Sequence, residues 1–201
     1  MKIMKCIASL LVTTLLLISC GGNITVAEGL IGNVTMDGYE GRKVYLETTD
    51  VNSSIVDSTT VVDGKFAFTF NDTVPQVYRL VLTASDNDRF PITLPVVSEK
   101  GQVKVVMGEL VLTSGTALND ALQDFLLAIS NFTDKAMKQE EPDMNKVSED
   151  FAKLVEGAVM GNIDTPVGVY IYRSYQSKLS DQQKATIMLR AGENFKKAVN
   201  Q

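Results

Sequence analysis

Apolar and polar residues alternate with a period near two through the first half of the chain, from Glu28 to Thr113. Successive side chains of a β-strand point to opposite faces, so this period predicts strands with one buried face. The runs are short, turn residues separate them, and no helical period lies between them. This arrangement predicts an antiparallel β-sandwich of about seven strands over residues 28–113.

The strand-like runs are 29–36, 43–48, 55–62, 65–70, 77–83, 90–97 and 102–107. Asp63-Gly64 joins two of these runs, and this dipeptide favours a two-residue turn of the primed type. Phe66, Phe68 and Phe70 alternate in the run that follows, so we expect them to face the core together.

Two prolines, Pro91 and Pro95, fall within or beside the run 90–97. Proline has no backbone N–H to donate to a neighbouring strand. We therefore expect this run to lie at a sheet edge or to be irregular.

The period changes after Ser114-Gly115-Thr116, where apolar residues begin to recur every three or four positions. This stripe predicts an amphipathic helix and consists of Leu118, Leu122, Phe125, Ile129 and Phe132. Glu140-Glu141-Pro142-Asp143 ends that helix and caps the next one. The apolar face of the second helix is predicted to be Val147, Phe151, Leu154 and Ala158.

Two more helix starts follow. Asp164-Thr165-Pro166 has the cap-then-proline order of a helix start and leads into residues 167–178. Ser180 and Gln183 form a capping box for a last helix ending near Val199. The β-branched and aromatic run 167–172 also suits a strand. Together these patterns predict about four helices over residues 114–201, and hence an α+β fold.

The first twenty residues are organised differently. Lys2 and Lys5 precede the apolar run 7–18, which is too short to span and remain in a membrane. Leu17-Ile18-Ser19-Cys20 then follows the bacterial lipobox pattern. We predict a lipoprotein signal peptide over residues 1–19, lipidation of Cys20, and a flexible tether over residues 20–27. An ordinary cleaved secretory signal is the alternative.

The content of cysteine and histidine limits the reactions and metal sites that this chain could support. The chain has two cysteines and no histidine. Cys6 leaves with the leader and Cys20 carries the anchor, so no thiol remains for a disulfide, a zinc site or a nucleophile. Histidine is the commonest general base and the commonest metal ligand, so its absence removes both. Because no local nucleophile or phosphate-binding motif occurs either, we expect a protein without enzyme activity, cofactor or metal.

The charge balance constrains the partners. The formal net charge is −5, and removal of the leader leaves 17 basic against 24 acidic residues. An acidic surface argues against nucleic acid and against attraction to anionic lipid, so acyl chains would form the membrane anchor. Gly21 follows Cys20, where an aspartate would signal retention in the inner membrane. We expect the outer membrane, facing the periplasm.

Two acidic groups offer candidate chemistry. Asp86-Asn87-Asp88 supplies closely spaced oxygen ligands for calcium, but it lacks the glycine and distal glutamate of an EF-hand loop, and such clusters commonly form turns. Asp120 and Asp124 lie four residues apart on one helix face. Paired carboxylates perform acid–base work in glycosidases, whereas a solvated acidic face is the simpler interpretation.

Two further groups suggest recognition or modification. Tyr170, Tyr172, Tyr175 and Arg173 form an aromatic and cationic group suited to stacking on a sugar ring, although helix packing explains Tyr170, Ile171 and Tyr175 more simply. Asp57-Ser58-Thr59 and Asp72-Thr73-Val74 fit a short acceptor pattern that some Gram-negative bacteria use for O-glycosylation of exported proteins.

Several short motifs resemble those of one domain family. They are Gly29-Leu-Ile-Gly32, Val44-Tyr-Leu46, Asp57-Ser58, Val62-Asp-Gly-Lys-Phe66, Pro75, Tyr78-Arg-Leu80, Ser114-Gly-Thr116 and Leu118-Asn-Asp120. The family is the domain of unknown function that precedes a thioredoxin-like domain in many exported bacterial lipoproteins of the thiol-disulfide oxidoreductase type. The resemblance covers about residues 26–125, and its motifs are turns and core positions.

In those longer relatives a spacer and then a redox domain with a Cys-x-x-Cys pair follow. The helical residues 114–201 resemble the spacer, the sequence ends at Gln201, and it holds no such pair. The resemblance therefore implies a lipoprotein of unknown function, assigns no catalytic residue, and leads us to expect that the redox domain is absent.

Three hypotheses for the function follow. The leading one is a non-catalytic interaction or assembly module that receives an unknown envelope protein or peptide at a sheet edge or helix groove. The second is an accessory or remnant partner of an exported thiol-disulfide oxidoreductase. The third is a carboxylate-based hydrolase that uses Asp120 and Asp124.

Overall fold

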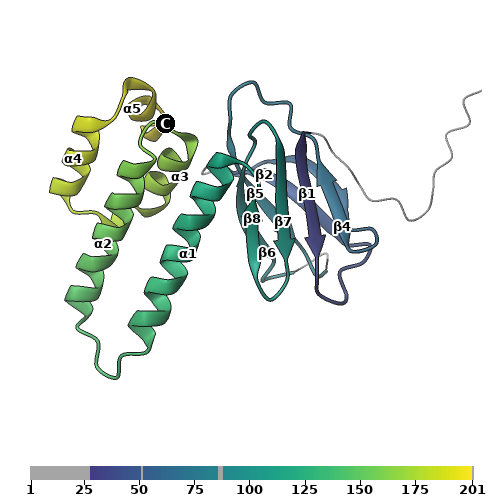
Figure 1. Cartoon of the computed structure of the whole chain (residues 1–201), viewed down its shortest axis with the longest axis horizontal. Coiled ribbons are helices and arrows are strands. Elements are labelled where there is room, and N and C mark those ends of the chain that lie inside the picture. Colours follow the sequence, from purple (N-terminus) through teal and green to yellow (C-terminus); the bar gives the residue numbers. More distant parts are fainter. Residues whose placement is uncertain (1–27, 51, 86–87, 201) are drawn as a thin grey trace, which may run out of the picture.

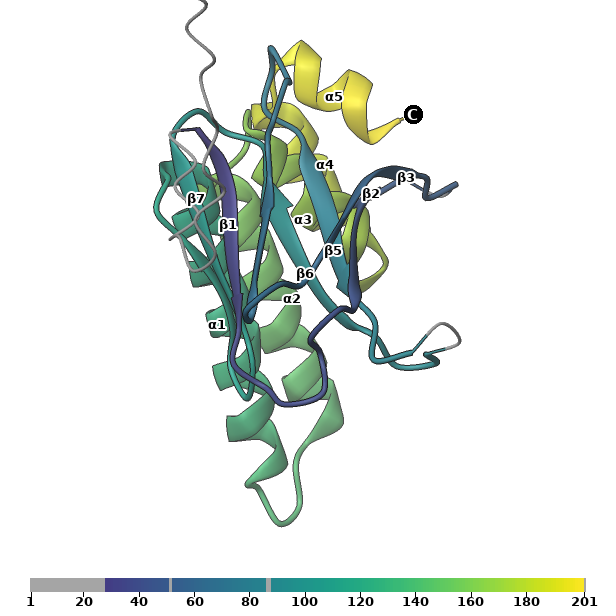
Figure 2. The same ribbon diagram turned by 90° about the vertical axis from the view of Figure 1, so that its right-hand side faces the viewer.

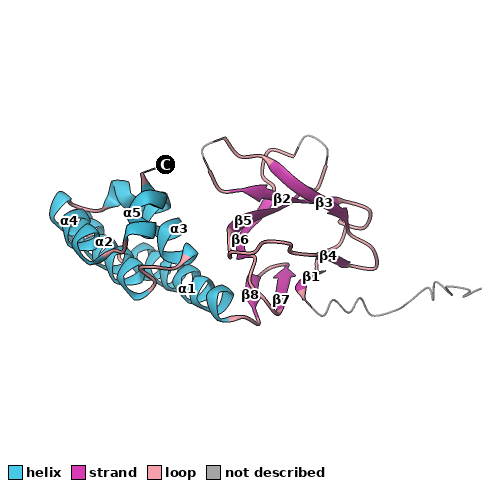
Figure 3. Cartoon of the chain, turned by 90° about the horizontal axis from the view of Figure 1, so that it is seen from above, coloured by secondary structure: helices cyan, strands magenta, loops and turns pink. Residues whose placement is uncertain are grey.

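The computed structural model describes residues 28–50, 52–85 and 88–200 (Figure 1). Within these residues, eight strands in two sheets come first and five α-helices follow, which confirms the α+β fold. Strands and helices are segregated to opposite ends of the molecule, as Figure 3 shows from above. The predicted leader, Cys20 and the predicted tether lie outside the described residues.

Each sheet has four strands. The first has the order β4-β1-β7-β8, with β1 (Gly29–Val34), β4 (Lys65–Phe68), β7 (Gln102–Met107) and β8 (Val111–Ser114). The second has the order β3-β2-β5-β6, with β2 (Lys43–Thr48), β3 (Ile55–Thr60), β5 (Val77–Leu82) and β6 (Ile92–Val97). Figure 2 shows the two sheets from the sandwich side, with the helices behind them. β6 lies at an edge, as its prolines predict.

One strand pair departs from the expected antiparallel arrangement. β1 and β7 run parallel, from Gly29 opposite Gln102 to Val34 opposite Met107 (Figure 1). The chain between them forms β4 and all four strands of the second sheet, and β7 then starts at the end where β1 begins. There Gly29 N donates to Gly101 O at 3.0 Å. A period of two is the same in either orientation, so the sequence pattern does not distinguish them.

The core of the sandwich lies between the two sheets. Its fully buried members include Leu30, Val44, Phe66, Leu80, Leu82, Val96, Val103 and Met107. The predicted inward face of the phenylalanine strand is confirmed, because Phe66 and Phe68 are buried and Phe70 packs against them. The rings of Phe66 and Phe68 meet edge to face, with centroids 6.2 Å apart.

The predicted turn at Asp63-Gly64 is also confirmed. Both residues have positive φ, 50° and 69°, as a type I′ turn requires. Val62 and Lys65 exchange backbone hydrogen bonds of 2.9 and 3.0 Å across it. The pairing stops there, because β3 and β4 belong to different sheets. The turn therefore carries the chain from one sheet to the other.

The helices are α1 (Ala117–Met137), α2 (Met144–Gly161), α3 (Pro166–Tyr175), α4 (Asp181–Arg190) and α5 (Glu193–Val199), with a 3-10 turn η1 (Gln176–Lys178) after α3. The three predicted caps are present: Asp143 on α2, Thr165 on α3, and the capping box of Ser180 with Gln183 on α4. The run 167–172 is helical. The predicted last helix is two helices, because Gly192 N leaves the helical ladder and donates to Asp164 Oδ1 at 2.9 Å.

The helices form a second core, next to that of the sandwich. Its fully buried residues include Val97, Leu122, Val155, Val159, Val167, Ile171 and Ile187. The predicted face of α2 is displaced by one position: Val155 and Val159 are fully buried, whereas Phe151, Leu154 and Ala158 lie at the margin. α2 contacts α1, α3 and α4, so its buried stripe is wider than the one predicted.

A buried amide fastens α1 to the sandwich. Asn119 has no exposed surface, and its Oδ1 accepts from Val97 N while its Nδ2 donates to Val97 O, both at 2.9 Å. Its Nδ2 also donates to Thr116 Oγ1 at 2.8 Å. On β8, Thr113 N donates to Gln123 Oε1 at 2.7 Å. Side chains of α1 thus complete the hydrogen bonding of the β6 and β8 edges.

Candidate functional site

A cleft lies where the sandwich meets the helices, with a volume of about 440 Å³. Its walls come from the loop before β5, from the residue after β2, and from α3 and α5. We name it the junction cleft and define it by Thr49, Gln76, Asp164, Tyr170, Arg173 and Asn194. Figure 3 shows α3 to be the helix that faces β5 at this junction. A volume of this size suits a small molecule or a few residues of peptide.

The helical period of α3 decides which side chains reach the cleft. Pro166, Val169, Tyr170 and Arg173 recur every three or four residues and line it. Ile171 lies on the opposite face and is fully buried in the helical core. One face of α3 thus anchors the helix while the other forms the wall of the cleft.

The predicted aromatic group is therefore divided. Tyr170 and Arg173 line the junction cleft, whereas Tyr172 is buried in the helical core and Tyr175 packs against it. Tyr170 also packs against that core. The ring of Tyr172 meets Phe195 edge to face at 5.7 Å, and Tyr175 meets Phe125 in the same way at 5.5 Å. All three tyrosines therefore take part in packing, and Tyr170 lines the cleft as well, together with Arg173.

The polar groups of the cleft differ in whether they have hydrogen-bond or ion-pair partners. Burial raises the pKa of Tyr170, with a smaller contribution from Tyr175, so its phenol stays neutral well above pH 7. Asp164 accepts from Gly192 through Oδ1. Arg173 makes no hydrogen bond or ion pair with the described residues. Its guanidinium is the unpartnered charge of the cleft.

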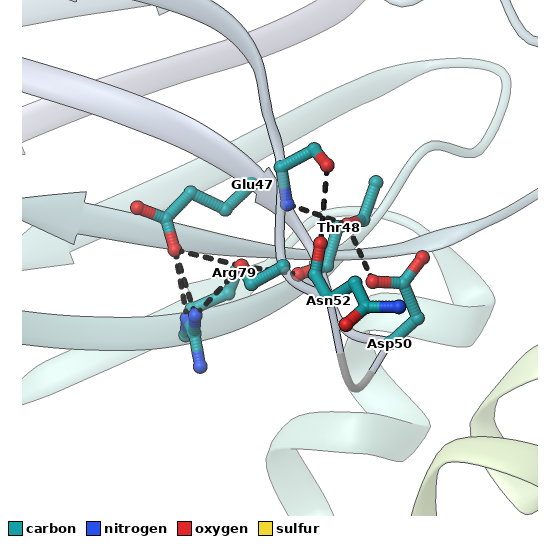
Figure 4. Close-up of polar contacts among 7 residues, drawn as sticks. Glu47, Thr48, Asp50, Asn52 and Arg79 are labelled. Carbon is teal, nitrogen blue, oxygen red and sulfur yellow. Dashed lines mark hydrogen bonds and ion pairs between the residues drawn. The ribbon is translucent and has the colours of Figure 1, made fainter.

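An ion pair on the second sheet fixes the region beside the cleft (Figure 4). Arg79 on β5 donates to Glu47 Oε2 on β2 through Nη2 at 2.7 Å and through Nε at 3.3 Å. Its Nη2 also donates to Ser53 Oγ at 2.9 Å, which holds the loop after β2. Thr49 in that loop donates to Val77 O at 3.2 Å. These bonds position one wall of the cleft, and no local motif in the sequence indicates them.

Asp120 and Asp124 are both exposed on α1. Asp120 Oδ1 accepts from Gly115 N at 2.9 Å, which stabilises the turn between β8 and α1. Glu99 caps the same helix from the sandwich by accepting from Leu118 N at 2.9 Å. The geometry gives Asp120 a structural role at the start of the helix.

Asp88 is the described member of the proposed calcium loop, and Asp86 and Asn87 lie outside the described residues. Its carboxylate accepts from Ala84 N at 2.8 Å and from Phe90 N at 2.9 Å. These backbone hydrogen bonds lower the pKa of Asp88. The described residues contain no group of three acidic, cysteine or histidine side chains arranged to hold a metal ion.

The two possible glycosylation acceptors are accessible. Ser58 is exposed on the edge strand β3, and Thr73 is exposed in the loop before β5. The acidic residues that precede them are engaged, since Asp57 Oδ1 accepts from Ser58 N at 2.7 Å and Asp72 Oδ1 accepts from Tyr78 at 3.0 Å. Exposure is compatible with modification at either position.

Among the described helices, none is both long and apolar enough to cross a membrane.

The architecture defines the class of protein: an α+β chain in which a two-sheet sandwich carries a docked helical region. Residues 30–122 match the model of a family described as a domain of unknown function, DUF4369. The match extends from β1 through the sandwich into the start of α1, so it includes Asn119, and it confirms the resemblance seen in the sequence. The position of such domains ahead of thioredoxin-like domains stays a prediction. No curated protein matches the chain significantly.

Proposed function

We propose that this chain is a lipid-anchored, non-catalytic interaction module of the bacterial cell envelope. Cys20 would hold it at the outer membrane, facing the periplasm. The observation that carries the proposal is the lipobox Leu17-Ile18-Ser19-Cys20 behind a basic and apolar leader. The order of these segments suits export followed by acylation.

The interaction part of the proposal is supported by the shape and chemistry of the described residues. The sandwich and helices meet at a cleft with an unpartnered guanidinium, and the chain has neither histidine nor a thiol beyond Cys6 and Cys20. Such a site favours recognition of an envelope protein or peptide over catalysis.

The anchor is tested by metabolic labelling with an alkyne fatty acid. We expect the wild-type chain to be labelled and to sediment with the outer membrane, and C20S to be unlabelled. C6S is the matched control, because Cys6 lies in the leader, and it should be labelled like the wild type. An unlabelled wild-type chain, or loss of label in C6S alone, contradicts the proposal.

The partner is tested by cross-linking in intact cells, followed by purification of the chain in detergent. We expect one envelope protein or peptide to be recovered in stoichiometric amount. Recovery of the chain alone contradicts an interaction module.

A second candidate is an accessory partner of an exported thiol-disulfide oxidoreductase. The match to DUF4369 over residues 30–122 favours it, given the resemblance described above. It predicts that the cross-linked partner is a thioredoxin-like protein encoded nearby. A partner without a Cys-x-x-Cys pair excludes this candidate.

A further inference from the structure

The charges of the junction cleft are separated along α3. Asp164 lies just before the helix, and Arg173 lies in its last turn. Seven residues separate Pro166 from Arg173, which corresponds to about 10 Å of helix. Three residues of extended peptide span the same length, at roughly 3.3 Å each.

Two uncharged polar side chains that line the cleft are exposed. Gln76 and Asn194 form no side-chain hydrogen bond with the described residues, and the hydrogen bonds of Gln76 use its backbone. A primary amide has both donors and acceptors, and so does a peptide group. The cleft therefore offers hydrogen-bond partners that match those of a peptide group.

The end of the cleft at Arg173 is suited to a carboxylate. A guanidinium presents parallel N–H donors that match the two oxygens of a carboxylate, and the Arg173 guanidinium has no partner among the described residues. The chain as a whole is acidic, with a net charge of −5. Val169 and the ring of Tyr170 provide an apolar wall beside it.

We propose that the junction cleft binds an extended peptide segment of about three residues whose carboxylate is held by Arg173. The inference rests on the proposed function, because it names the chemistry of the partner that the module receives. The carboxylate comes either from a peptide C-terminus or from an acidic side chain, and both present the same two oxygens to Arg173.

The test uses the full mature chain in detergent and measures peptide binding by isothermal titration. The probes are three libraries of N-acetylated tripeptides: one with a free C-terminal carboxylate, one amidated with a central glutamate, and one amidated and uncharged. We expect a charged library to bind and the uncharged library not to bind. Which charged library binds identifies the source of the carboxylate.

Substitutions locate the binding. R173Q should weaken binding by about ten- to a hundredfold, because hydrogen bonds to a charged group are lost, and R173K should retain part of it. N194A should weaken it by a smaller factor. R190Q is the matched control, since Arg190 is exposed at the end of α4 and does not line the cleft. It should bind like the wild type.

Three results overturn the inference: equal binding of the uncharged library, unchanged binding by R173Q, or binding of free glucuronate without binding of any peptide. These results are distinguishable from failure of the proposed function. If wild type and R173Q cross-link the same partner equally in cells, the chain is still an interaction module, but the junction cleft is not its binding site. Peptide binding by a chain that is never acylated retains the cleft and rejects the anchor.

Discussion

At the scale of single residues, Tyr78 has the clearest titration effect. Its phenol donates to Asp72, and burial, this hydrogen bond and the carboxylate charge together raise its pKa to about 12. An unfolded tyrosine titrates near pH 10, so the stabilisation is complete below about pH 10 and is lost as the pH rises through about 12. We predict that the free energy of unfolding decreases over this window, and that Tyr78→Phe makes the decrease shallower in urea titrations.

The same pair allows a spectroscopic control. Asp72→Asn keeps a hydrogen-bond acceptor but removes the charge that opposes ionisation of Tyr78. The last step in the absorbance titration of the tyrosines should then move to lower pH. An unaltered titration in Asp72→Asn, or an unchanged alkaline slope in Tyr78→Phe, would show that the pair has no such role.

The sequence predicted part of the candidate site at this scale. Tyr170 and Arg173 were identified because they are neighbours in one helix, and their spacing of three places both on the face of α3 that lines the cleft. Gln76 and Asn194 lie far away in the sequence, in a loop and in another helix. Only tertiary packing brings them to the cleft, so no local pattern identified them.

At the scale of elements, Gly32 on β1 permits the close packing of the sandwich. A Cβ at this position would overlap the ring of Phe66, which pairs with Gly32 across β1 and β4. We predict that Gly32→Ala destabilises the protein by about 1–3 kcal/mol in urea unfolding, through overpacking of a buried site. The double variant with Phe66→Leu should lose less unfolding free energy than the sum of the two single variants, because the Phe66 ring is what the added Cβ would overlap.

A glycine in the interior of α2 gives the contrasting case. Among the described residues, no atom outside the neighbouring backbone of α2 lies within 4 Å of the position that a Cβ added at Gly157 would occupy. Gly157→Ala should therefore stabilise the chain by about 0.5–1 kcal/mol, since alanine loses less backbone entropy in a helix. A loss of stability at Gly157, or no loss at Gly32, would contradict the packing described for these two elements.

Most elements followed from local patterns, and the exceptions have physical causes. The caps at Asp143, Thr165 and Ser180 were predicted because capping uses residues within one turn. β8 was missed because four residues are too few to establish a period. The division between α4 and α5 was missed because Asp164, which receives Gly192 N, is 28 residues away.

At the scale of the whole molecule, the two cores are in contact. Val97 of β6 belongs to the core of the helices, and Leu126 of α1 packs against both cores. Asn119 connects the same two elements through hydrogen bonds that have no access to water. We therefore expect strands and helices to unfold together, with amides of both cores exchanging at the free energy of global unfolding.

Substitution of Asn119 tests whether α1 couples the sandwich to the helices, apart from the stability of either part alone. Asn119→Ala leaves Val97 N and Val97 O without their partners in a buried position, which should cost about 3 kcal/mol. Hydrogen exchange should then show α3 to α5 losing protection before β1 and β7, because α1 connects the helices to the sandwich. Asn131→Ala, on an exposed position of the same helix, should leave exchange unchanged. Retained protection of the helices in Asn119→Ala would mean that apolar contacts alone hold the two parts together.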